Sequence, residues 1–159
     1  MAHKHLPVER IQEILGKASI GCLGTCVGEV PYAVPVTFVY YGGKIYFHSS
    51  PRGRKMENLA ANPRVSFQAS DEAVVIPTKK ACTFTTHYYS ALMEGTASIV
   101  RDPELRLAAL RALVAKYDPE GLAPPLTPQD MEGQDIVVVE ITPDNLGGVD
   151  HARLPQAKP

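Results

Sequence analysis

The residues best able to do chemistry lie together in one short run, His48–Lys55, with the sequence HSSPRGRK. Ser50 is predicted to cap a helix that begins at the following proline, because serine favours the N-cap and proline the first helical position. Arg52, Arg54 and Lys55 then fall in or just beyond the first turn, where the helix dipole disfavours cations. Free amides, hydroxyls and cationic side chains are what a phosphate monoester requires. The run indicates a phosphate site, with a solvated basic turn as the alternative.

Short strands joined by tight turns, with a few helices between them, must position this run. Gly42-Gly43, between β-branched and aromatic residues, predicts a tight hairpin. A helix over 102–117 is predicted with Asp102 as its cap. The other predicted helices cover 7–17 and 51–61, and the predicted strands cover 19–27, 32–41, 64–69, 80–86, 88–100 (with a break near His87) and 135–142. This order predicts a mainly β fold, a closed barrel with short helices, and an all-β sandwich is the competing architecture.

The segment 32–41, YAVPVTFVYY, is the most informative of these strands. It is apolar on both faces, which predicts burial on both sides. Pro35 inside it predicts a bulge or a sheet edge, because proline cannot donate to a β-ladder. One chain of this length has little material to cover both faces, so we expect a homodimer.

Length and composition restrict the class of protein. The 159 residues fit a single domain over 1–150, followed by a polar tail over 151–159. A formal net charge of -1 argues against nucleic acid as a partner. Three cysteines without a secretion signal are typical of reduced thiols in the cytoplasm, and no apolar run is long enough to predict a membrane helix.

The remaining histidines do not form a recognisable site. His3 and His5 have no matching cysteine or histidine spacing, so no metal site is predicted. His87 and His151 are interpreted as surface residues, because no haem motif surrounds either of them.

The ordered series PYAVPVTFVYYGGKIYFHSSPRGRKMENLAANPRVSF resembles the pyridoxamine 5'-phosphate oxidase-like FMN-binding split barrels. Within them it is most similar to the branch that includes nitroimidazole-resistance proteins. Members show a P-Y-x-V-P-V-N-F strand, a hairpin ending in F-H, then G-R-K and N-x-R-V-x-F. A later Y-x-S with a downstream glycine is matched by Tyr88, Ser90 and Gly95. The resemblance spans 8–142, with Thr37 and Tyr89 standing where relatives often carry asparagine and an acid.

This resemblance implies an intertwined homodimer with two FMN sites at the subunit interface, each built from both chains. Arg54 and Lys55 would bind the phosphate, aided by Ser49 or Ser50. Tyr88 and Ser90 are candidates for contacts from the partner chain. The residues expected along the isoalloxazine are Val34, Pro35, Val36 and Thr37, with His48 near the flavin as the candidate catalytic residue.

The function implied is that of an FMN-dependent oxidoreductase that reduces a small organic electron acceptor, such as a nitro compound. No Gly-rich dinucleotide fingerprint is present, so a reduced nicotinamide donor would have to dock transiently at the flavin. Two alternatives stay open: a flavin-binding protein without turnover of its own, and a haem-binding split barrel.

Overall fold

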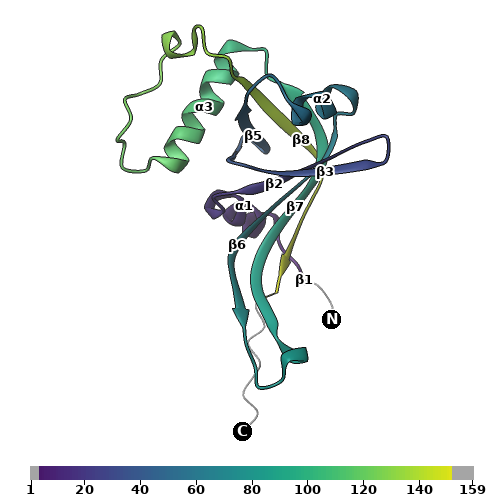
Figure 1. The fold of residues 1–159 in the computed structure, drawn as a ribbon. Coiled ribbons are helices and arrows are strands. Elements are labelled where there is room, and N and C mark those ends of the chain that lie inside the picture. The colour runs from purple at the N-terminus through teal and green to yellow at the C-terminus, as the bar shows by residue number, and fades with distance from the viewer. Residues whose placement is uncertain (1–3, 152–159) are drawn as a thin grey trace.

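The computed structural model describes residues 4–151, and its strands form one antiparallel sheet wrapped into a barrel (Figure 1). The strand order is β3-β2-β6-β7-β8-β5-β4, and β1 pairs with β8. The strands are β1 Lys4–His5, β2 Gly21–Val27, β3 Val30–Val36, β4 Val39–Tyr41, β5 Lys44–Ser49, β6 Arg64–Ile76, β7 Thr85–Ile99 and β8 Val137–Asp150. The fold is mainly β with short helices, as the sequence predicted.

The barrel wraps around a core of large apolar side chains, with β3 and β4 at the two ends of the sheet. Phe38, Phe47 and Phe67 are fully buried there, and the Phe38 and Phe67 rings meet edge to face with centroids 4.8 Å apart. Gly21 makes room for this packing, because a Cβ atom at that position would lie 2.0 Å from the Phe67 ring. The aromatic core therefore depends on a glycine in the opposing strand β2.

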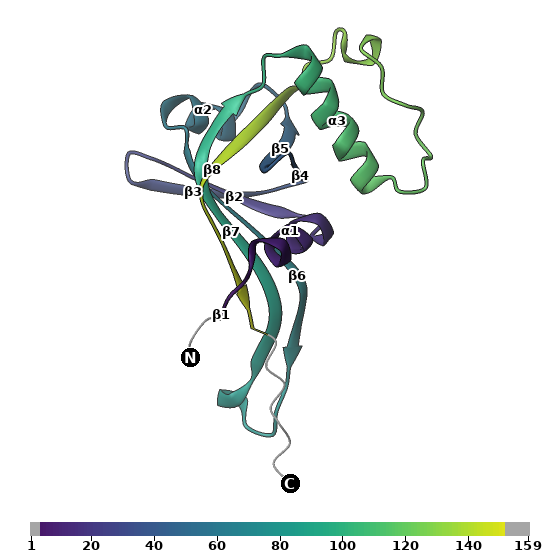
Figure 2. The ribbon, with the colours of Figure 1, turned by 180° about the vertical axis from the view of Figure 1, so that it is seen from behind.

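Three α-helices decorate the barrel. α1, Val8–Lys17, matches the predicted helix and buries Ile11, Ile14 and Leu15. α3, Pro103–Tyr117, begins as predicted, because the Asp102 carboxylate accepts a hydrogen bond from the Glu104 amide at 3.1 Å. α2, Arg54–Ala61, follows β5. Figure 2 shows α1 and α3 beside the sheet, with α2 at the upper end of the barrel. No helix of the described residues is long and apolar enough to cross a membrane.

The predicted strand 32–41 is two strands rather than one. β3 ends at Val36 and β4 starts at Val39, and the fully buried Phe38 lies between them. β3 is the edge strand of the sheet, which confirms one of the two positions expected for Pro35. Burial on both faces is wrong for the single chain: Ala33 and Pro35 are exposed, since no element of the described chain covers that face.

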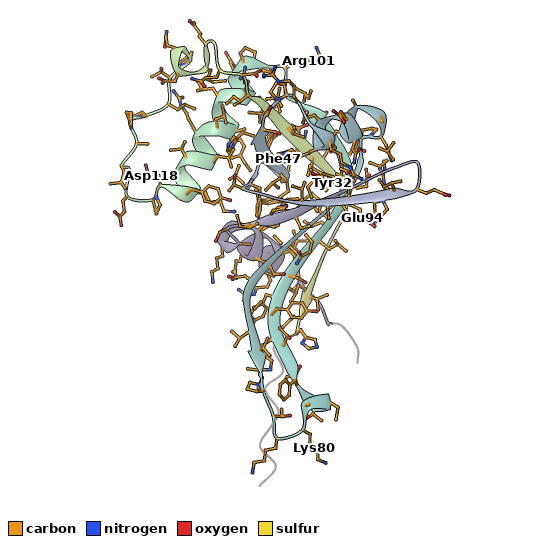
Figure 3. All side chains as sticks on the ribbon, in the orientation of Figure 1. Tyr32, Phe47, Lys80, Glu94, Arg101 and Asp118 are labelled. Carbon is orange, nitrogen blue, oxygen red and sulfur yellow. The ribbon has the colours of Figure 1, made fainter. Side chains whose placement is uncertain are left out.

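The predicted break near His87 is also wrong. β7 is one continuous strand, and β6 extends past residue 69 to pair with it, with Val74 opposite His87. Together they form a hairpin arm that extends away from the barrel and carries Lys80 near its tip (Figure 3). The irregularity lies instead in β6, between Asp71 and Val74. β8 likewise continues beyond residue 142, because its residues 139–150 pair with β7.

The interpretation of His87 and His151 as surface residues is wrong as well. Both are partly buried. His87 Nε2 is buried without a hydrogen-bond partner among the described residues, and His151 stacks on the Tyr88 ring with centroids 5.2 Å apart. The rest of the tail predicted over 151–159, and His3, lie outside the described residues.

Candidate functional site

The basic turn differs from its prediction in where the helix begins. α2 starts at Arg54, three residues later than expected, and its N-cap is Gly53 with φ of 101°. Ser50 is therefore not the cap: its hydroxyl accepts a hydrogen bond from the Arg52 amide at 3.3 Å. The glycine decides the start, because only glycine adopts this backbone conformation without strain.

Arg54 and Lys55 consequently occupy the first two positions of the helix. The Arg54 guanidinium lies 4.5 Å from the centroid of the Tyr32 ring, and Lys55 Nζ lies 5.4 Å from that of Phe47. Figure 3 labels both rings. Burial lowers the pKa of Lys55. Among the described residues neither cation forms an ion pair. Two positive charges thus share a helix start, and Glu57, the acidic residue of that first turn, is paired with neither among the described residues.

Arg52, in the same turn, has a different environment. Its guanidinium forms an ion pair with Asp135, and both side chains are largely exposed. This arginine already has a countercharge, and it lies before the helix begins. Arg52 therefore differs from Arg54 and Lys55, although the three cations are close together in the sequence.

The remaining candidates of this region lie on β3 and β5 or directly after them. Val34 and Val36 are partly or fully buried, whereas Pro35 and Thr37 are exposed. On β5, His48 is exposed and Ser49 is buried, with the Ser49 hydroxyl donating to the Ser50 carbonyl at 2.9 Å. The exposed Ser50 hydroxyl is thus more accessible to a ligand than that of Ser49.

Tyr88 and Ser90 lie elsewhere in the chain. α2 contacts β2 through Asn58, whose side chain donates to Thr25 at 2.9 Å, and Thr25 is level with Gly95 of β7 across β6. Ser90 is five residues from Gly95, roughly 16 Å along the strand. One chain therefore does not bring Tyr88 and Ser90 to the cations of α2.

The sequence did not predict a groove that adjoins Thr37 and His48. It has a volume of about 490 Å³ and runs between β5, α3 and the loop that follows α3. Its apolar lining residues are Leu110, Leu113, Val114, Leu126, Met131 and Ile136. The polar residues at its edge are Thr37, His48, Tyr117 and Asp130. The helix periodicity could have indicated an apolar face of α3, but not that a loop would close over it.

Side-chain hydrogen bonds hold the walls of this groove. The Tyr117 hydroxyl accepts from the Phe38 amide at 2.9 Å and is within donating distance of the Ser19 carbonyl, at 2.7 Å. Asp118, labelled in Figure 3, follows the end of α3. Its carboxylate accepts hydrogen bonds from the Leu122 and Ala123 amides. Arg111 of α3 donates from Nε to the carbonyl of Leu126, which lies further along the loop, at 2.9 Å. The loop is thereby tied to the helix, and the helix to the barrel.

Several solved structures share this fold. A candidate 5-nitroimidazole antibiotic resistance protein from Bacteroides thetaiotaomicron is 23% identical, with a TM-score of 0.74 over 93% of this chain and 88% of that one. The FAD and heme binding protein from Mycobacterium smegmatis is 16% identical, with a TM-score of 0.80 over 96% of this chain and 75% of that one.

A curated relative is matched over a shorter stretch. An uncharacterised protein of Rhizobium meliloti is 32% identical over 65 residues, which is 41% of this chain and 42% of that protein. The match thus spans less than half of the relative's length.

The family comparison covers nearly the whole barrel. The sequence model of the pyridoxamine 5'-phosphate oxidase family matches residues 7–149, from the start of α1 almost to the end of β8. Since the match includes β3, the basic turn and β7, the chain belongs to the pyridoxamine 5'-phosphate oxidase family of flavin-binding split barrels.

Proposed function

We propose that the protein is an FMN-dependent oxidoreductase that acts on a small organic electron acceptor. The observation that carries this proposal is the pair Arg54 and Lys55, which stand at the start of α2 and form no ion pair among the described residues. A phosphate monoester supplies the missing negative charge and accepts from the free amides of the helix. The family supports a flavin as the molecule that carries this phosphate.

The residues around the turn suit the other parts of FMN. Pro35 of β3 and Thr37, just after that strand, are exposed and offer an edge for a flat ring, and the more buried Val34 and Val36 alternate with them. His48 and Ser50 are exposed near the helix start and can donate hydrogen bonds. FMN, when bound, supplies the electron transfer, so the protein's task is to orient the ring and exclude competing reactions.

A homodimer completes this proposed site. Ser90 lies roughly 16 Å and Tyr88 roughly 23 Å along β7 from the level of α2, so we place them away from the phosphate end of a flavin held by their own chain. The same residues of a second copy can approach the exposed face of β3. The proposed site therefore takes its phosphate end from one subunit and Tyr88 and Ser90 from the partner.

Titration of apo-protein with FMN, FAD and riboflavin tests the phosphate assignment. Loss of one charge-assisted contact costs about 2–5 kcal/mol, a weakening of roughly thirtyfold to several-thousandfold. We expect Arg54→Ala and Lys55→Ala to weaken the binding of FMN by such factors and to leave the affinity for riboflavin nearly unchanged. Arg52→Ala is the matched control, because its charge is already paired with Asp135, and it should bind FMN like wild type.

Two results would count against this assignment. Equal FMN affinity in wild type and the Arg54→Ala/Lys55→Ala double variant would show that the phosphate binds elsewhere. A parallel loss for riboflavin would mean that the substitutions had damaged the fold. FAD binding tighter than FMN would correct the identity of the flavin while retaining the site.

Turnover separates the proposed enzyme from its alternatives. The purified protein should be yellow with flavin absorbance, whereas a haem protein would show a Soret band. With a reduced nicotinamide donor and a nitroaromatic acceptor, we expect acceptor-dependent oxidation of the nicotinamide. A protein that binds FMN tightly but turns over none of a panel of donors and acceptors would be a carrier instead.

A further inference from the structure

We infer that the groove between α3, β5 and the loop 118–136 binds the substrate, a neutral fused-ring aromatic compound with a carbonyl oxygen at one end. This inference rests on the proposed function, since it places the electron acceptor beside the proposed flavin. The groove and the proposed site share Thr37 and His48, so a molecule in one reaches the edge of the other.

The size and lining of the groove fit a ring compound. A volume of about 490 Å³ is in the range of sites for drug-sized ligands. Leu110 and Leu113 of α3 form its floor together with Ile136, and Leu126 and Met131 of the loop line it too. Nearly all of the surface offered is aliphatic, which favours a flat apolar molecule over a sugar or a peptide.

The charges at the groove disfavour an anionic ligand. Among the described lining residues there is no lysine or arginine. Asp130 stands at the edge, and its carboxylate accepts from the Thr127 hydroxyl at 2.6 Å and from the Thr127 amide at 2.7 Å. These hydrogen bonds lower the pKa of Asp130, so the carboxylate is ionised at neutral pH. A phosphorylated or carboxylated ring would be repelled, whereas a neutral ring would not.

The polar end of the groove sets the orientation of the ligand. The Thr37 hydroxyl and the His48 ring can each donate a hydrogen bond. The Tyr117 hydroxyl is already used by the Phe38 and Ser19 backbone. Donors at one end of an aliphatic slot suit a ligand with a carbonyl or similar oxygen directed to Thr37 and His48. The end of the ligand that carries this oxygen would thus lie nearest the proposed flavin.

Calorimetric titration with chromone, a neutral two-ring ketone, tests this inference without any redox step. We expect saturable binding to wild type, weakened at least about tenfold by Val114→Glu, which puts a carboxylate on a lining residue. Ala115→Glu is the matched control: it adds the same charge to the next residue of α3, which is exposed and outside the groove. Leu126→Asn tests the opposite wall without altering the helix.

The anionic analogue chromone-2-carboxylate tests the role of charge. It should bind at least about tenfold more weakly than chromone, and Asp130→Asn should narrow that gap. Equal effects of Val114→Glu and Ala115→Glu, tighter binding of the carboxylate than of chromone by wild type, or no saturable chromone binding would overturn the inference. Displacement of chromone by FMN would also overturn it, since the groove would then hold the flavin.

The same titrations distinguish this inference from the proposed function. If chromone binds as described but FMN does not bind to Arg54 and Lys55, the proposed oxidoreductase fails and the groove remains a ligand site. If FMN binds as proposed and Val114→Glu leaves chromone binding unchanged, only the groove assignment fails.

Discussion

The Lys116 side chain is partly buried on the side of α3 that faces the barrel. Its Nζ donates to the Leu15 carbonyl at 3.0 Å and lies 3.7 Å from the centroid of the Phe38 ring. Burial lowers the pKa of Lys116 to about 8. In the unfolded chain a lysine keeps a pKa of about 10.4. Between these values the unfolded chain binds more protons than the folded one, so stability rises with pH.

Replacing Lys116 with methionine should remove this pH dependence. The full shift would amount to ~3 kcal/mol, and solvent screening of a half-buried side chain reduces it to about 1 kcal/mol. We expect the free energy of unfolding of wild type to rise by about that much relative to Lys116→Met between pH 7.5 and 10. Urea unfolding at several pH values measures this. Lys17→Met, at an exposed site on α1, is the control and should follow wild type.

At the scale of single elements, Tyr117 is the link between α3 and the barrel. Its hydroxyl meets the Phe38 amide just where the chain breaks between β3 and β4. Tyr117→Phe would leave the Phe38 amide without this partner, which costs about 1–3 kcal/mol when a donor is buried. We expect a loss of stability of that size by urea unfolding. Tyr41→Phe, on the exposed end of β4, is the control and should lose little.

The same substitution, Tyr117→Phe, should also lower the affinity of the groove for chromone. Because Tyr117 also lines the groove, a helix freed at this end would let the walls separate, and chromone affinity should fall further than stability alone requires. Unchanged chromone affinity in a folded Tyr117→Phe protein would show that Leu110 and Leu113 alone hold the helix in place.

The elements that could be predicted from sequence are those whose signals are local. The amphipathic stripe of α1, the Asp102 cap of α3 and the two glycines of the hairpin act within a few residues, and all three were correctly predicted. The extended ends of β6 and β8 could not be predicted. Residues such as Val74 and Leu146 become strand because they pair with β7, and that partner lies far away in the sequence.

The basic turn shows the same limit inside the candidate site. The sequence correctly placed Arg54 and Lys55 at a helix start, because glycine, proline and serine cluster just before them. It chose the wrong cap, since Ser50 and Gly53 both have cap preferences and only the folded backbone decides between them. The groove depends on Leu126 packing over α3, a contact between a loop and a helix that no periodic pattern indicates.

At the scale of the whole molecule, the hairpin arm of β6 and β7 presents apolar side chains that the chain itself does not cover. Val75 is 63% exposed, Val74 53%, Phe84 51% and Leu92, further along β7, 49%. A group of large apolar residues on one projecting arm is typical of an interface between proteins. The proposed homodimer gives this surface a partner, and it is the arrangement that would bring Tyr88 and Ser90 to a second chain.

Charges placed on the arm should therefore dissociate the dimer. We expect wild type to sediment as a dimer at micromolar concentration, and Val75→Asp/Phe84→Asp to shift it to folded monomer. Leu122→Asp is the control, because Leu122 is 83% exposed but lies in the loop after α3. A wild-type monomer would contradict the dimer, and an arm variant that remains fully dimeric would place the interface elsewhere.

Subunit complementation tests whether each flavin site is shared between two chains. One parent carries Lys55→Ala and the other Tyr88→Ala/Ser90→Ala, and each homodimer should bind FMN weakly. In the mixed dimer one site combines both defects, whereas the other joins an intact Lys55 to an intact Tyr88 and Ser90. We expect the mixed dimer to bind one FMN, rather than two, with wild-type affinity. If each site were built within one chain, every site of the mixed dimer would keep a defect, and fluorescence titration would detect no tight binding.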